Sequence, residues 1–255
     1  MTEIMLLLAG LLGGAVNTLA GGGSFIVFPA LLLAGVPPVL ANASNTYAAL
    51  PGYIAGAIGL RKQMLEQRHL LLPYGVVAVL FGYAGAELLL RVSDAQFSVV
   101  VPWLMLFAVV LFAFGGRLNA MVAARAGGRR GAKAAGAILL YLLLAGVSIY
   151  GGFFNAGLGV LLLAFLTLAG IANIHAANGL KLYLSSLIAV VAVVRFVLAG
   201  SIDWYHGSIA LVGVTTGAYV AARLATRIPS GLIRAVVIIY GLGLTAYFFW
   251  ATYGV

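Results

Sequence analysis

The sequence predicts an all-α integral membrane protein built from two inverted-topology repeats. Apolar residues make up 64% of the 255 residues and charged residues 7%, a balance that soluble globular domains do not show. An apolar stretch interrupted by glycines also occurs twice, at residues 4–34 and 135–169. Each stretch exceeds the roughly 20 residues that a spanning helix needs, yet it is too short for two full helices and a loop. We therefore expect each to form a broken hairpin of half-helices inside the membrane.

The remaining apolar runs complete each repeat with three spanning helices. The first repeat, residues 1–115, continues with runs at 39–60, 70–90 and 97–115, and a linker at 116–134 follows it. The second repeat, residues 135–255, continues with runs at 174–200, 206–224 and 231–252. This gives eight hydrophobic segments and about ten helices in a single membrane domain over residues 1–255. Matching residues recur at an offset of 135, as with Gly22 and Gly157, and later at 132, as with Ala86 and Ala218.

The distribution of Lys and Arg predicts the orientation. Basic residues gather in the 61–69 loop, the 116–134 linker and the 223–234 loop, so we expect these on the cytoplasmic side. Each broken segment must then enter and return on one side, which makes the repeats inverted and places both termini outside. Whether the broken segments are re-entrant or make two full crossings stays open. Near the outer ends, Glu87 and Arg91 have the spacing of an i,i+4 ion pair, and Arg195 is expected to extend its charge to the interface.

Several classes of function are excluded by what the chain contains. It has no Cys, which removes thiolate metal sites and Cys nucleophiles. Its formal charge of +9 follows from loop residues that obey the positive-inside rule, so no nucleic-acid partner is expected. The three His residues lack metal-ligand spacing, and Ser24 has no His or Asp partner within the apolar segments for hydrolysis. We expect no enzyme, no cofactor and no metal.

The first break, NTLAGGGSF at 17–25, has the donors that a small anion needs. Glycines let the backbone turn and expose N–H groups, and the next half-helix directs the positive end of its dipole at the break. The alternative is close helix packing through small residues. The candidate substrate-binding residues here are Asn17, Thr18, Gly21, Gly22, Gly23 and Ser24.

The second break, YGGFFNAGLG at 150–159, is its counterpart. A buried Asn155 must find a hydrogen-bond partner, and this partner is either the substrate or a group that braces the hairpin. The candidates are Tyr150, Asn155, Gly157 and Gly159.

Two polar helix faces supply the other candidates. Lys181 lies inside an apolar segment, where a charged residue marks a functional site by default, although it could also extend to the cytoplasmic surface. Asn178 shares its helical face. In the first repeat a polar face is expected to look at a cavity or a partner helix, and it consists of Asn42, Ser44, Asn45 and Thr46.

The stretches 17–52 and 151–181 resemble the two signature regions of the TauE/SafE sulfite exporter family. The resemblance implies a bacterial inner-membrane exporter of small sulfur-containing anions, such as sulfite or organosulfonates, coupled to protons. Family members carry Thr-Asn-Lys near Ser44-Asn45-Thr46. Here the Lys is missing from the first copy and only Lys181 keeps a cation at the equivalent place, which leaves the substrate open.

The residues and the resemblance together predict a secondary active transporter that alternates access to a midplane site. A passive anion channel is the alternative. The expected partners are a small anionic substrate, protons and the lipid bilayer. A homodimer is one arrangement that the sequence leaves open.

Overall fold

A computed structural model describes residues 1–255 apart from 21, 127–132, 172, 225–229 and 255. Within this part of the chain every regular element is a helix, as the sequence predicts, and none is a strand. The first half contains α1 (Thr2–Ala20), α2 (Ser24–Leu33), α3 (Pro38–Gly59), α4 (Arg61–Leu65), α5 (Arg68–Leu90) and α6 (Asp94–Ala126). The second half contains α7 (Lys133–Phe154), α8 (Leu158–Leu168), α9 (Ile174–Leu198), α10 (Trp204–Leu224) and α11 (Ser230–Tyr253).

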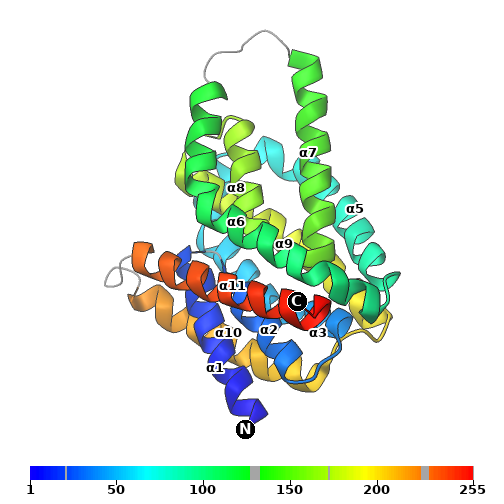
Figure 1. The fold of residues 1–255 in the computed structure, drawn as a ribbon. Helices are drawn as coiled ribbons and strands as arrows, with labels where there is room; N and C mark the ends of the chain where they lie inside the picture. The colour runs from blue at the N-terminus through cyan, green and yellow to red at the C-terminus, as the bar shows by residue number, and fades with distance from the viewer. Residues whose placement is uncertain (21, 127–132, 172, 225–229, 255) are drawn as a thin grey trace.

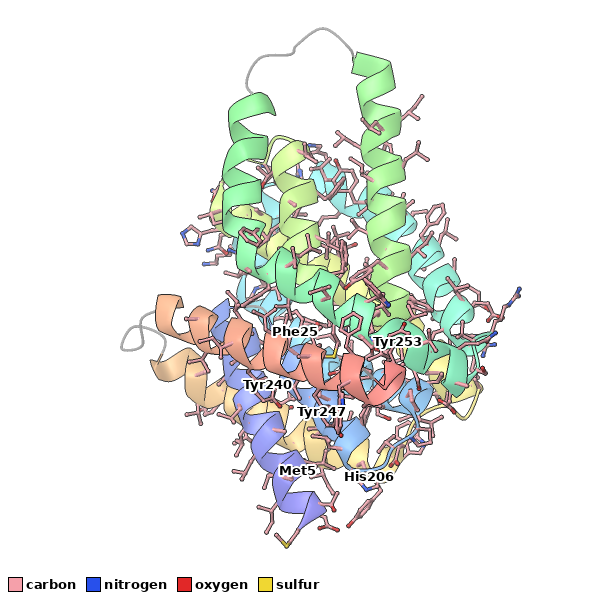
Figure 2. All side chains as sticks on the ribbon, in the orientation of Figure 1. Met5, Phe25, His206, Tyr240, Tyr247 and Tyr253 are labelled. Atoms are coloured by element: carbon pink, nitrogen blue, oxygen red, sulfur yellow. The ribbon has the colours of Figure 1, made fainter. Side chains whose placement is uncertain are left out.

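The helices have the lengths and composition of a multi-pass membrane protein. Among the described residues, four stretches are long and apolar enough to span a membrane, namely 68–90, 94–114, 174–198 and 235–253. Figure 2 shows mostly carbon side chains on the outside of the helices. The helices α3 and α10 have spanning length but are not among these four stretches. Much of α3 is buried between other helices, including its polar residues, so it does not need an apolar surface.

The expected 116–134 linker is largely helical. The helix α6 continues to Ala126 and α7 begins at Lys133, because residues 116–126 are rich in the helix formers Ala, Arg, Met and Leu. The two helices therefore extend into the expected linker from both sides. The 225–229 part of the expected 223–234 loop lies outside the described residues.

The helices pack in pairs that relate the two halves. The first helix of each half packs against the other half, α1 on α10 and α7 on α5, and α3 packs on α9. Glycines allow both of the first contacts. A Cβ atom at Gly14 would lie 2.0 Å from the carbonyl oxygen of Val214, and one at Gly85 would lie 2.1 Å from that of Ile149. In Figure 1, α1 and α7 start at opposite ends of the molecule, so the breaks that follow them meet in its middle.

A buried aromatic cluster holds the middle of the molecule. Phe28 of α2 packs edge to face on Phe154 of α7, with ring centroids 5.5 Å apart. Phe25, labelled in Figure 2, packs similarly on Phe112 of α6 at 5.8 Å. Edge-to-face pairs of this kind add about 0.5–1.5 kcal/mol beyond the area they bury. The cluster therefore fixes α2 and its neighbouring break against the centre of the fold.

Candidate functional site

Each break is a short non-helical link between two half-helices. The helix α1 ends at Ala20 and α2 begins at Ser24, while α7 ends at Phe154 and α8 begins at Leu158. Gly157 caps α8 with φ of +80°, a conformation that glycine adopts without steric cost. A Cβ atom there would also lie 3.2 Å from that of Ala108 on α6. The second break is thus shaped for glycine by both its backbone and its neighbour.

The backbone amides at the breaks are less available than the sequence suggested. The N–H groups of Phe25 and Ile26 donate to the carbonyls of Gly22 and Gly23. At the second break, the N–H groups of Leu158 and Val160 donate to Asn155 and Gly157. Local turns therefore satisfy these first-turn donors, which the prediction of bare amides did not allow for. In this conformation these four amides are not free to bind a ligand.

The two breaks meet around one small polar cavity of about 20 Å³. This is room for about one water molecule. The first break contributes two polar side chains, the second break contributes three residues, and α3 and α9 supply the rest. The lining residues are Asn17, Ser24, Tyr53, Asn155, Gly157, Gly159, Lys181, Leu182 and Ser185.

Asn155 offers the cavity an unused donor. Its side chain is 2% exposed, and its Oδ1 accepts a hydrogen bond of 3.1 Å from the hydroxyl of Tyr53. Its Nδ2 has no partner among the described residues. A buried donor without a partner costs about 1–3 kcal/mol, so a ligand oxygen beside Nδ2 would remove that cost. The sequence analysis did not include Tyr53 among the candidates. A hydroxyl in the middle of an apolar run was the signal that could have indicated it.

Lys181 stands between the cavity and a larger space. Its side chain is partly buried and passes close to Gly159, where an added Cβ atom would lie 3.6 Å from Cδ of Lys181. No acidic group among the described residues lies within 4.0 Å of its ammonium group. A cation held near the centre of the fold without a counterion is suited to an anionic ligand.

The larger space is a vestibule of about 470 Å³ at the end of the molecule that carries α4. It shares Asn17, Lys181 and Leu182 with the cavity, and its wall includes the predicted residues Thr18 and Asn178. The other lining residues are Gly52, Gly56, Leu60, Leu163, His175, Val214 and Ala218. The central cavity therefore adjoins a space at the α4 end.

At the opposite end, three residues that correspond to the vestibule wall are buried. At the repeat offsets, Asn178 corresponds to Ala43, Leu163 to Phe28 and Ala218 to Ala86. These three counterparts are at most 1% exposed.

An ion-pair network lies at that opposite end. Leu60, at the vestibule rim, corresponds to Arg195, whose Nε lies 2.7 Å from Oε2 of Glu87. The predicted pair of Glu87 with Arg91 is also present, at 3.2 Å. Arg195 thus binds Glu87 instead of extending freely to the interface as expected. The described structure has a vestibule at the α4 end and packed side chains at its counterpart.

Three residues of the predicted polar face of α3 form hydrogen bonds with backbone groups of the protein. Nδ2 of Asn42 donates to the carbonyl of Phe153 at 2.7 Å, and the hydroxyl of Thr46 donates to the carbonyl of Asn42 at 3.0 Å. The hydroxyl oxygen of Ser44 accepts from the N–H of Asp203 at 2.9 Å. Asn45 lines a separate space of about 10 Å³ beside Asn17, Gly23 and Ser24. Only Asn45 of this face thus approaches the first break.

Three other predicted residues are not among those that line the cavity or the vestibule. The hydroxyl of Tyr150 donates to the carbonyl of Ala156 at 2.6 Å, which ties the end of α7 to the break. Gly22 packs against the ring of Phe112, where a Cβ atom would approach to 3.0 Å. Gly21 lies outside the described residues.

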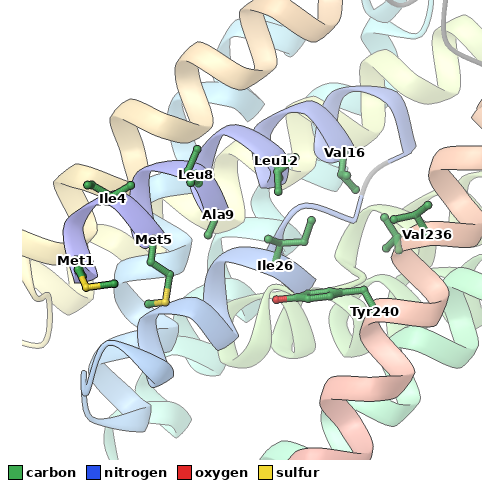
Figure 3. Close-up of a pocket in the computed structure, with 11 residues that line it drawn as sticks. Met1, Ile4, Met5, Leu8, Ala9, Leu12, Val16, Ile26, Val236 and Tyr240 are labelled. Atoms are coloured by element: carbon green, nitrogen blue, oxygen red, sulfur yellow. The ribbon is translucent and has the colours of Figure 1, made fainter.

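A further large space is apolar. A groove of about 550 Å³ lies between α1, α2 and α11. Figure 3 shows Tyr240 beside Ile26 in its wall. Its wall consists of Met1, Ile4, Met5, Leu8, Ala9, Leu12, Val16, Ile26, Val236, Val237 and Tyr240. None of the described residues that line it has a charged or amide side chain, unlike those of the central cavity.

Comparisons with known proteins agree with this architecture. The profile of the family described as Sulfite exporter TauE/SafE matches residues 6–248. A protein of Haemophilus influenzae named "Probable membrane transporter protein" is 31% identical over 248 residues, covering 95% of this chain and 92% of the relative. "Probable membrane transporter protein YfcA" of Escherichia coli K12 is 27% identical, covering 98% of this chain and 90% of the relative. No solved structure matches. The chain belongs to the TauE/SafE sulfite exporter family and is a membrane transporter, not an enzyme.

Proposed function

We propose that this transporter is a secondary active carrier that exports small sulfur-containing anions, such as sulfite or organosulfonates, coupled to protons. The observation that carries the proposal is the central cavity, where Lys181 and the unpartnered Nδ2 of Asn155 line one space between the two breaks. A cation and neutral donors are the groups that stabilise an oxyanion. The choice of sulfur-containing anions rests on the description of the family, which names sulfite.

The vestibule favours a carrier over a channel. A channel needs a continuous path, whereas here three counterparts of the vestibule residues, Phe28, Ala43 and Ala86, are buried, and Glu87 pairs with Arg195 near them. A carrier in which one half moves against the other would open the two paths in turn. The asymmetry therefore supports alternating access.

The proposed orientation places the α4 end in the cytoplasm of a bacterial inner membrane. Arg61, Lys62 and Arg68 lie at this end, in agreement with the positive-inside rule. Both termini lie at the other end. Glu3 accepts a hydrogen bond from Tyr205 in the first turn of α10, and Tyr253 donates to the carbonyl of Val99 near the start of α6. In this orientation the vestibule faces the cytoplasm, which is where an exporter loads.

Counterflow in proteoliposomes tests the proposal. Vesicles loaded with unlabelled methanesulfonate or sulfite should accumulate the labelled anion transiently, because a carrier exchanges its substrate across the membrane. Single-channel currents in planar bilayers without counterflow would identify a channel instead. An absence of both in folded protein would refute the proposed function.

A further inference from the structure

We infer that the site accepts a monovalent oxyanion, and that the proton accompanying sulfite travels on the substrate as hydrogen sulfite. The inference rests on the proposed function and specifies the charge of its substrate. The observation behind it is the set of charges around the two connected spaces. Among the described residues that line the cavity and the vestibule, the basic ones are Lys181 and His175, and none is acidic.

Lys181 is the single formal charge at the cavity itself. His175 lies in the first turn of α9 and is exposed, so it belongs to the vestibule rim. The other polar groups of the cavity are the neutral side chains of Asn17, Ser24, Tyr53, Asn155 and Ser185. One bound negative charge would therefore neutralise the site, and a second would stay uncompensated inside the protein, where an unpaired charge is strongly disfavoured.

The elements packed around α9 add no acidic group to the site. Tyr53 of α3 faces the cavity, and α8 has no acidic or basic residue. On α7, the hydroxyl of Tyr150 is bound to the carbonyl of Ala156. On α4, Arg61 and Lys62 are exposed at the rim, where Glu66 accepts a hydrogen bond from Asn173.

The carboxylate of Glu87 on α5 forms ion pairs with Arg91 and Arg195. These pairs lie near the end of α9 that is far from Lys181. Arg195 lies fourteen residues after Lys181, which corresponds to about 21 Å along a helix. None of the described carboxylates therefore lines the cavity or the vestibule where the anion would bind.

The chemistry of sulfite provides another route for the proton. Sulfite takes up one proton to give hydrogen sulfite, a monoanion, and no other bond forms or breaks. Proton movement would then accompany sulfite because only its protonated form fits the charge of the site. Simple alkanesulfonates such as methanesulfonate are monoanions throughout the neutral range, so they would cross without a proton.

A flux comparison in proteoliposomes tests the inference, with the membrane potential fixed by potassium and valinomycin and a pH dye in the lumen. Methanesulfonate uptake should change less than twofold between about pH 6 and pH 8 and should move no protons. Sulfite uptake should rise several-fold as the pH falls, following its hydrogen sulfite fraction, and should move protons. Sulfate and thiosulfate, which are dianions in this range, should cross at less than a tenth of the methanesulfonate rate.

Two transport results with the wild-type protein would overturn the inference while leaving the proposed function intact. One is sulfate uptake as fast as that of methanesulfonate, and the other is proton movement with methanesulfonate. The variant His175→Gln tests whether His175 carries the proton instead. Loss of the pH dependence of sulfite uptake in this variant would assign the proton to His175 and overturn the inference. Retention of the wild-type pH dependence supports transport of hydrogen sulfite. Failure of both methanesulfonate and sulfite to cross would instead overturn the proposed function.

Discussion

Replacing Lys181 by Met should reduce anion transport at least about tenfold. The cavity is about 20 Å³, so an anion that enters it must contact the side chains of its wall, including Lys181. Two unit charges 4 Å apart attract by about 4 kcal/mol at an effective dielectric constant of 20. Each 1.4 kcal/mol is a factor of ten, so the attraction sets an upper limit of about a thousandfold. Water in the vestibule and the desolvation of both ions lower this value.

The assay is counterflow of labelled methanesulfonate, with size-exclusion chromatography to show that each variant is folded. Lys181→Arg keeps the charge and should retain more transport than Lys181→Met. Lys62→Met is the matched control, because it removes an exposed lysine of α4 outside the lining of both spaces and should leave the rate unchanged. A folded Lys181→Met protein with near-normal counterflow would remove Lys181 from the site.

Three further predictions concern the contacts around the site. Tyr53→Phe leaves Oδ1 of Asn155 without its partner, so it should raise KM for the anion with a cost of about 1–3 kcal/mol; an unchanged KM would show that the hydroxyl does not position Asn155. Gly14→Ala should lower the melting temperature, because its Cβ atom would lie 2.0 Å from a carbonyl oxygen of α10 and overpacking costs about 1–3 kcal/mol or more. Gly243→Ala is the control, because an added Cβ atom there has nothing within 4 Å, and it should leave the melting temperature unchanged or raise it. An equal fall in melting temperature in the two variants would contradict the α1–α10 contact.

The sequence was sufficient to place the two breaks and their meeting point. Glycines and Asn inside an apolar run mark backbone that leaves the helix, and such a mark at equivalent positions of two halves locates a shared site. Asn17, Ser24, Asn155 and Lys181 indeed line one cavity. Their polarity in an apolar segment is a local signal, so it can be read without knowledge of the packing.

The roles of the polar residues on α3 were not predictable in this way. Asn42 and Ser44 bind backbone groups of residues more than a hundred positions later in the chain, and no local pattern reveals such partners. The partner of Arg195 was missed for the same reason, because Glu87 lies on another helix. The first-turn amides were judged free from helix geometry alone, whereas the folded turns provide carbonyl acceptors.

The correspondence between the halves predicts a second conformation that labelling can detect. If one half moves against the other, Ala43 should line an outer vestibule as Asn178 lines the one described. Ala43 is fully buried, so a cysteine there should resist a water-soluble maleimide in this state. The wild-type chain has no Cys, and each single-cysteine variant therefore reports one position.

Glu87→Gln should increase labelling of Ala43→Cys from the outer side. The substitution weakens the ion pair with Arg195 at the end opposite α4, and this pair would have to separate for that end to open. Ala78→Cys is the matched control, because Ala78 is equally buried but does not correspond to any vestibule residue. Labelling of both cysteines would indicate general loosening of the fold. An unreactive Ala43→Cys, with and without Glu87→Gln and during transport, would contradict alternation between equivalent halves, because the path to the outside would then have to run elsewhere.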